Sequence, residues 1–341
     1  MPGTEVSDPN YEFQDIVQTR KKELDGVAKA GVFLRPLTWL LHGFFGLSRM
    51  LGFERAAYKP LIGAFAKMFD GAIDKAFKDY TPKSSDVFIC SYFKSGTNWA
   101  MHTAYQIAEH GEGEFEDALD VMPWADCPSP ATTAQLDDPR QQQRSQSGLR
   151  VIKTHARAEF VPYNEQAKYI CVVRDPKEVT VSSHFFFGKM LFGDLIPSVQ
   201  GWVDSCTSPG AIFHPWYEFT AGYWGWRERP NVLFITYNQM QADPEATVRR
   251  FANHIGVELT DEAVKKVLHL SSYDHMKSID HKFYPGEVSP FARKGGSMIR
   301  SGKQGNSGEL LNPAQQQQID DWNRAGLKQL GSDFPYDELL S

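Results

Sequence analysis

Four short apolar runs, separated by segments of helical periodicity, dominate the chain from residue 86 onward. They read DVFICSY, LRVIKTH, KYICVVRD and NVLFITY and begin at Asp86, Leu149, Lys168 and Asn231. Runs of this length are typical of buried strands, and their alternation with helices is typical of a parallel sheet. The pattern therefore predicts an α/β domain with a central parallel sheet flanked by helices.

The rest of the chain is predicted to be mostly helical. Residues 1–80 are interpreted as a helical N-terminal extension packed on a domain that spans residues 81–341. Further helices are expected within 243–259, over 261–270 and from 312 to about 330. A polar stretch between the first helix of the domain and the second run is rich in Gln, Ser and Pro, which predicts a surface loop.

The most apolar segment covers residues 33–53, FLRPLTWLLHGFFGLSRMLGF. It is interrupted by Arg35, Pro36, His42 and Arg49 and is short for a bilayer crossing, so no membrane span is predicted. An amphipathic helix packed on the domain is the favoured interpretation. Peripheral contact with a membrane surface and cover over an apolar substrate site are the alternatives.

Composition narrows the function classes. The chain has 341 residues, of which 41% are hydrophobic, so it can bury a substantial core. Its formal net charge of −6 argues against a general nucleic-acid binder, which needs a basic surface. The four cysteines form no CxxC pair, and the N-terminus lacks the pattern of a secretory signal. A reduced, cytoplasmic location is expected, with membrane association as the alternative.

The first apolar run leads into the loop FKSGTNW and then into a helix. The first backbone N–H groups of such a helix have no partner within it and point one way, which makes an anion site. Gly96 allows close approach of a ligand, Ser95 and Thr97 add hydroxyl groups, and Lys94 adds a positive charge. We expect a phosphate or a related anion here; the alternative is an ordinary strand-to-helix turn. A Walker loop has its lysine after the glycines, next to a magnesium ligand, and this loop does not.

Three further motifs carry candidate chemistry. Lys153 and His155 end the second run at the sheet edge where parallel sheets bind ligands, and His155 is suited to accept a proton; a structural histidine is the alternative. Arg174 ends the third run and could hold a phosphate through paired hydrogen bonds, or form a structural salt bridge. The stretch FARKGG, from Phe291, suits a mobile loop over a phosphate or a solvated turn.

Taken together, these motifs resemble the cytosolic, PAPS-dependent sulfotransferase family. SYFKSGTNW is similar to the family's 5′-phosphosulfate loop, usually written TYPKSGTTW. IKTH, VVRDPKEVTVSSHFF, VLFITYNQM, SSYDHM and SPFARKGG then follow in the family's order with similar spacing. The set covers roughly Asp86 to Gly296, and as an ordered set it is highly specific.

The resemblance implies a P-loop-like nucleotide-binding fold and transfer of a sulfuryl group from 3′-phosphoadenosine 5′-phosphosulfate (PAPS) to a hydroxyl or amine. It implies His155 as general base, Lys94 as the group that neutralises the leaving nucleotide, and Lys153 as a contact to the sulfuryl oxygens, with no metal. Aromatic stretches after the nucleotide motifs favour a small, lipophilic hydroxyl acceptor. The implied nucleotide-binding residues are Lys94, Ser95, Gly96, Thr97, Asn98, Trp99, Arg174, Ser182, Tyr237, Ser271, Tyr273, Met276, Phe291, Arg293, Lys294 and Gly295.

The chain also departs from the family pattern. Phe93 stands where the family usually has proline, and Asn98 where it often has threonine. The residues after RKGG lack the usual GDWK and dimer segments, so no oligomeric state is inferred. A PAPS-using dehydratase, a P-loop nucleotide kinase and a non-enzymatic nucleotide-sensing or membrane-surface module are the alternative functions.

Overall fold

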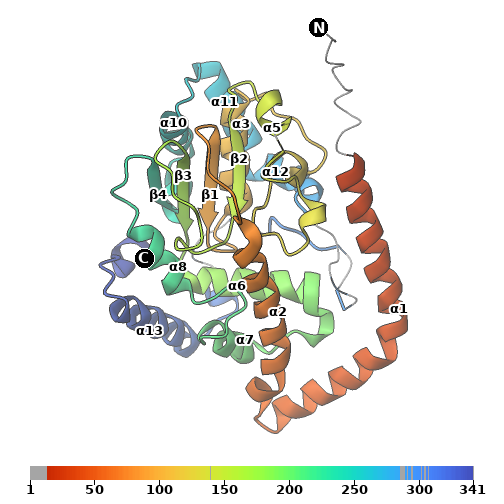
Figure 1. Cartoon of the computed structure of the whole chain (residues 1–341). Coiled ribbons are helices and arrows are strands. Elements are labelled where there is room, and N and C mark those ends of the chain that lie inside the picture. The colour runs from red at the N-terminus through yellow and green to blue at the C-terminus, as the bar shows by residue number, and fades with distance from the viewer. Residues whose placement is uncertain are drawn as a thin grey trace.

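Four parallel strands form the centre of the molecule (Figure 1). The computed structural model describes residues 14–138, 140–284, 289, 291–292, 295–300, 302, 305 and 307–340. The strands are β1 (Asp86–Ser91), β2 (Arg150–Thr154), β3 (Lys168–Val173) and β4 (Val232–Thr236), in the spatial order β2-β1-β3-β4. All three neighbouring pairs are parallel, and Cys90 lies beside Thr154 on one side and Cys171 on the other. The four predicted strands and the predicted sheet are confirmed.

Helices cover both faces of this sheet. One face packs on α3, α10 and α11 through Val87, Ile89, Ile170 and their neighbours. The other face packs on α2, α6, α8 and the C-terminal helices through a larger cluster that includes Phe88 and Tyr169. The helices of four or more residues are α1 (Gln14–Met50), α2 (Glu54–Ala76), α3 (Thr97–Ala108), α4 (Ala118–Val121), α5 (Arg140–Arg144), α6 (Pro176–Phe187), α7 (Val199–Cys206), α8 (Trp216–Trp224), α9 (Tyr237–Ala242), α10 (Pro244–Ile255), α11 (Asp261–Leu270), α12 (Tyr273–Ser278), α13 (Pro313–Gln329) and α14 (Tyr336–Leu340), with one π-helical segment, η2 (Gly188–Phe192).

The predicted helices in the last third of the chain are confirmed. Local capping explains their ends: the Asp243 carboxylate accepts a hydrogen bond from the Ala246 amide at the start of α10, and Gly256 ends this helix at a φ of 80°. The expected polar loop between α4 and β2 contains two short helical pieces, η1 (Pro130–Thr132) and α5. It is also tied to the N-terminal region, because the Ser129 hydroxyl donates to the Glu23 carboxylate.

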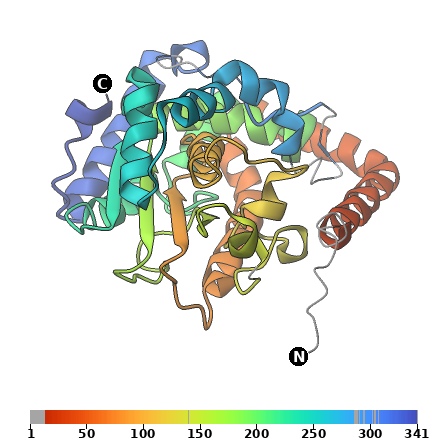
Figure 2. The same cartoon turned by 90° about the horizontal axis from the view of Figure 1, so that it is seen from above.

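The N-terminal region forms a long helix, α1, and a return helix, α2, which confirms the helices predicted there. Both views place α1 at one edge of the molecule, away from the sheet (Figures 1 and 2). Tyr58, Ile62 and Ile73 of α2 belong to the larger core cluster. The division of the chain at residue 80 stays a prediction. In the part of the chain that the structure describes, no helix has the length and apolar character needed to cross a bilayer.

Candidate active site

The loop between β1 and α3 has the backbone of an anion-binding turn. Lys94 has a φ of 63° and Gly96 a φ of 90°, and Gly96 caps α3 without any side-chain hydrogen bond. The first amides of α3 are therefore left for a ligand. The loop is held from below, since the Ser91 and Thr97 hydroxyls are 2.7 Å apart and Arg174 Nη1 donates to the Lys94 carbonyl at 3.3 Å.

Gly96 is required at its position for two reasons. Its φ lies in the left-handed region, and a Cβ there would come within 2.6 Å of the Tyr237 ring. We expect Gly96→Ala to weaken binding of 3′-phosphoadenosine 5′-phosphate (PAP), the desulfated nucleotide, about tenfold or more and to lower the free energy of unfolding by about 1–3 kcal/mol. Titration with PAP and thermal unfolding measure the two effects.

The matched control for this prediction is Gly71→Ala in α2, where a Cβ would meet nothing within 4 Å. A glycine-to-alanine change inside an open helix position should stabilise the fold by about 0.5–1 kcal/mol and leave PAP binding unchanged. Wild-type PAP affinity in Gly96→Ala would contradict the placement of the nucleotide phosphate against this loop.

Lys94 is half-buried, and its amine lies in a positively charged environment. Burial, followed by the charges of Arg174 and Lys153, lowers its pKa to about 7. Its Nζ lies 4.1 Å from the centroid of the Phe186 ring, a cation–π contact that holds the amine inside the cavity. A buried amine among other cations is stabilised in its charged form by a bound anion, so this environment favours a phosphate or sulfate.

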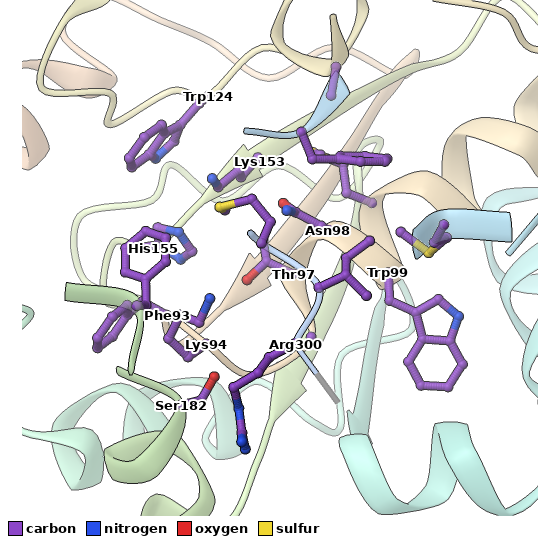
Figure 3. A pocket seen from close by; sticks show the side chains of 18 of the residues that line it. Phe93, Lys94, Thr97, Asn98, Trp99, Trp124, Lys153, His155, Ser182 and Arg300 are labelled. Carbon is purple, nitrogen blue, oxygen red and sulfur yellow. The ribbon is translucent and has the colours of Figure 1, made fainter. Parts of the chain in front are cut away.

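Lys153 and His155 reach the same cavity from the carboxyl end of β2 (Figure 3). The Nδ1 atom of His155 lies 2.8 Å from the Ser91 carbonyl oxygen, which can only accept; Nδ1 therefore carries the hydrogen and Nε2 is the nitrogen that can take up a proton. Burial, followed by the charge of Lys153, holds the pKa of His155 well below its usual value, so the imidazole is neutral near pH 7.

Asp126 and Trp124 hold His155 and Lys153 in position. The backbone amide of His155 donates to both carboxylate oxygens of Asp126 at 3.1 Å. Lys153 Nζ lies 3.9 Å from the centroid of the Trp124 ring, and burial lowers the Lys153 pKa to about 8. Trp124 Nε1 also donates to Asp126 at 3.1 Å, so one carboxylate orients both Trp124 and the backbone at His155.

One cavity of about 1100 Å³ joins these groups. Lys94, Lys153 and His155 point into its centre, with Ser182 and Arg300 beside Lys94 and with Trp99 to one side (Figure 3). The end near Trp99 is bounded by α3, α9 and α12. The opposite end is strongly aromatic and is bounded by α1, α2, α6 and η2, through residues that include Phe65, Phe69, Phe93, Phe186, Phe187 and Phe213. The arrangement can hold an anionic ligand at one end and an apolar ligand at the other.

Most of the predicted site residues line this cavity. Those that do are Lys94, Gly96, Thr97, Asn98, Trp99, Lys153, His155, Arg174, Ser182, Tyr237, Ser271, Tyr273 and Met276. Ser95 is buried in the loop behind them, and Phe291 and Gly295 do not line the cavity. Arg293 and Lys294 lie outside the described residues. The role of each of these residues in nucleotide binding stays a prediction.

Arg174 combines the two possibilities that its sequence position left open. It lines the cavity, and it also forms an ion pair with Glu178 one turn along α6, at 3.1 Å. Its guanidinium carbon lies 4.4 Å from the centroid of the Tyr237 ring. The ion pair is with Glu178, whereas the capping residue Asp175 pairs with Lys177.

Sequence reasoning missed several residues of the cavity. Arg300 lines it beside Lys94 and forms an ion pair with Glu309 at 2.8 Å. Its backbone carbonyl accepts a hydrogen bond from the Tyr273 hydroxyl at 3.1 Å, and Met298, Ile299 and Gly302 line the cavity with it. The only sequence signal was a basic, glycine-rich stretch after RKGG. Leu24 and Val27 of α1 gave no signal, because their place in the wall depends on contacts across more than a hundred residues.

Comparison with known proteins identifies this architecture. A family model described as "Sulfotransferase domain" matches residues 84–331. The chain is 23% identical over 267 residues to 3-beta-hydroxysteroid sulfotransferase of Cavia porcellus. This alignment covers 76% of this chain and 88% of that protein. It is 27% identical over 253 residues to Sulfotransferase 1E1 of Bos taurus, with coverage of 69% and 82%.

Solved structures agree on the fold. Retinol dehydratase in complex with retinol and PAP superposes with a TM-score of 0.59 at 20% identity, over 78% of this chain and 88% of that one. Mouse sulfotransferase SULT7A1 complexed with PAP superposes with a TM-score of 0.58 at 19% identity, over 77% of this chain and 90% of that one. The predicted P-loop-like fold is thereby confirmed.

Proposed function

Because the chain belongs to the sulfotransferase domain family, we propose that it transfers a sulfuryl group from PAPS to a hydroxyl or amine of a small, lipophilic acceptor. The observation that carries this proposal is the meeting of Lys94, Lys153 and His155 in one cavity beside the N-terminus of α3. Similar proteins named as sulfotransferases and the PAP bound in two structural neighbours support it.

The nucleotide occupies the end of the cavity formed by α3, α9 and α12. The amides of the loop and Lys94 bind the 5′-phosphate side, and Arg174 and Ser182 bind the 3′-phosphate. Trp99 and Tyr273 enclose the adenine, with Tyr237 and Ser271 nearby. Arg293 and Lys294 complete the 3′-phosphate site, as the sequence resemblance implies.

Transfer proceeds with His155 as general base. His155 Nε2 removes the proton from the acceptor hydroxyl as its oxygen attacks sulfur, while the bond from sulfur to the bridging phosphate oxygen breaks in line. Lys94 neutralises the charge that grows on that bridging oxygen, and Lys153 contacts the sulfuryl oxygens. These roles require little reorganisation of the neutral imidazole and of the two lysines during the reaction.

The acceptor occupies the aromatic end of the cavity. Phe93 and Phe213 stack there with ring centroids 4.1 Å apart, and the His155 ring meets Phe213 edge-on at 5.8 Å. An apolar wall around one proton acceptor selects an apolar molecule with a hydroxyl or amine. We also propose a reducing, cytoplasmic location, since all four cysteines are unpaired.

The direct test is incubation of the protein with PAPS labelled in the sulfuryl group and a panel of phenols, sterols and fatty alcohols, without added magnesium. The expected result is label in a sulfate ester of an acceptor and stoichiometric formation of PAP. Release of a dehydrated acceptor together with inorganic sulfate would instead indicate a dehydratase. Turnover of ATP that depends on magnesium, with none of PAPS, would overturn the proposal.

A further inference from the structure

The C-terminal half of α1 and the turn that leads into α2 carry an exposed apolar surface that the proposed reaction does not use. We call it the apolar tip: Leu37, Trp39, Leu40, Phe44, Leu47, Met50, Leu51 and Phe53. Trp39 is 85% exposed, Met50 75%, Leu40 72% and Leu51 60%. Isolated exposed apolar residues are common, but a continuous group of this size marks an interaction surface.

The apolar tip is a separate face from the one that packs on the protein. Leu37, Leu40, Phe44 and Leu47 follow helical spacing of three and four residues, so they share one side of α1, and Leu51 lies in the turn just after the helix. Phe45, the residue after Phe44, faces the protein instead, where it is buried and stacks on Tyr58 with ring centroids 4.0 Å apart. The C-terminal half of α1 is therefore apolar both toward the core and toward solvent.

The charge around the apolar tip is mainly positive. Residues 26–69 contain six Lys and Arg residues and one acidic residue, Glu54, although the whole chain has a formal net charge of −6. Glu54 is already engaged, because it pairs with Arg49 at 3.1 Å and accepts a hydrogen bond from the Ser198 amide at 2.8 Å. Arg55 and Lys59 of α2 are exposed beside the tip.

We propose that the apolar tip docks the protein on the surface of an anionic lipid bilayer. The exposed Trp, Phe and Leu side chains enter the boundary between headgroups and acyl chains, while the basic residues contact anionic headgroups. A surface made of large apolar groups with positive charge at its border matches this partner in both respects. The inference does not depend on the reaction proposed above.

The helix α2 runs from the apolar tip to the aromatic end of the cavity, and Phe65 lies about 18 Å along its axis from Phe53. Phe65, Met68 and Phe69 of α2 line that end, and Met68 is 44% exposed. Leu24 and Val27 of α1 line it as well. The two helices that carry the apolar tip thus also form part of the wall around the proposed acceptor site.

Sedimentation with vesicles tests the proposal. The full-length protein should bind phosphatidylcholine vesicles that contain about 30% phosphatidylserine, and bind pure phosphatidylcholine about tenfold or more weakly. The double variant Leu40→Asp and Leu47→Asp should lose binding about tenfold or more. Neither residue lines the cavity or is buried, so circular dichroism and PAP affinity should be unchanged. Leu330→Asp, at an exposed leucine beyond α13, is the matched control and should bind normally.

Two further variants separate the contribution of the basic residues to vesicle binding from that of the apolar side chains. Arg55→Glu with Lys59→Glu should weaken binding and flatten its salt dependence, whereas Lys265→Glu on α11 should not. Bromine on the acyl chains should quench tryptophan emission in the wild type, and Trp39→Phe should keep vesicle binding but lose most of this quenching. Equal binding by the Leu40→Asp, Leu47→Asp variant and the wild type would overturn the proposal. A second result would also overturn the proposal: the wild type is a dimer, this variant is a monomer, and neither protein binds vesicles.

Discussion

His155→Asn is expected to lower turnover of PAPS by about a hundredfold or more. Asparagine can still donate a hydrogen bond from its side-chain amide toward the Ser91 carbonyl, but it offers no basic nitrogen to the acceptor hydroxyl. Binding of PAP should change little, because no nucleotide contact is assigned to His155. Single-turnover transfer from labelled PAPS and calorimetric titration with PAP measure the two quantities separately.

A matched control and a pH profile make this test specific. His254→Asn removes another histidine whose pKa is lowered by burial, to about 4, and whose ring nitrogen lies near a backbone carbonyl, but it does not line the cavity. It should keep wild-type turnover. Because the pKa of His155 lies well below 6.5, kcat/KM of the wild type should not fall with acid until the pH is well below that value. Retained turnover in His155→Asn would exclude it as the base.

Lys94→Met is expected to reduce both PAP affinity, about tenfold or more, and turnover, about a hundredfold or more. The substitution keeps the apolar stem against Phe186 and removes the charge that neutralises the leaving oxygen. In the wild type, burial and the neighbouring positive charges lower the pKa of Lys94 to about 7 when the cavity holds no anion, so part of this amine is neutral at pH 7–8. A bound phosphate raises that pKa, and PAP binding at pH 7–8 should therefore take up protons.

Calorimetry in two buffers with different ionisation enthalpies measures this proton uptake. The wild type should take up protons, and its PAP affinity should fall as the pH rises above the pKa of Lys94. Lys94→Met should lose most of the uptake and retain the part due to Lys153, whose pKa is about 8. Lys265→Met, at an exposed position on α11, should behave as wild type. Unchanged proton uptake in Lys94→Met would show that the phosphate does not contact this amine.

Local signals in the sequence accounted for the sheet and for the centre of the site. Each strand is a short apolar run, and parallel strands place their carboxyl ends at one edge, so Lys94 and His155 could be expected to meet before any coordinates were known. Gly96 followed from the same local reasoning, and the structure adds the Tyr237 ring as a second reason for it.

Contacts between distant segments could not be predicted in this way. The Asp126 carboxylate beneath His155, the Arg300 side chain beside Lys94 and the wall formed by α1 each depend on chain segments that pack together only in the folded domain. They lie in a polar loop, a basic stretch and an amphipathic helix. Segments of these three kinds are common in proteins and do not indicate a particular site.

The pairing of β1 with β2 has a consequence for how the site tolerates change. Lys94 follows β1 and His155 follows β2, and the backbone bonds between these strands set Cys90 beside Thr154. Inserting one residue inside β2 would displace the imidazole by about 3.3 Å and turn it to the opposite face, although every side chain of the site would still be present. Insertions in the polar segment between α5 and β2 would not change the position of His155 relative to Lys94. Natural length variation compatible with function should therefore be confined to such segments and excluded from the two strands.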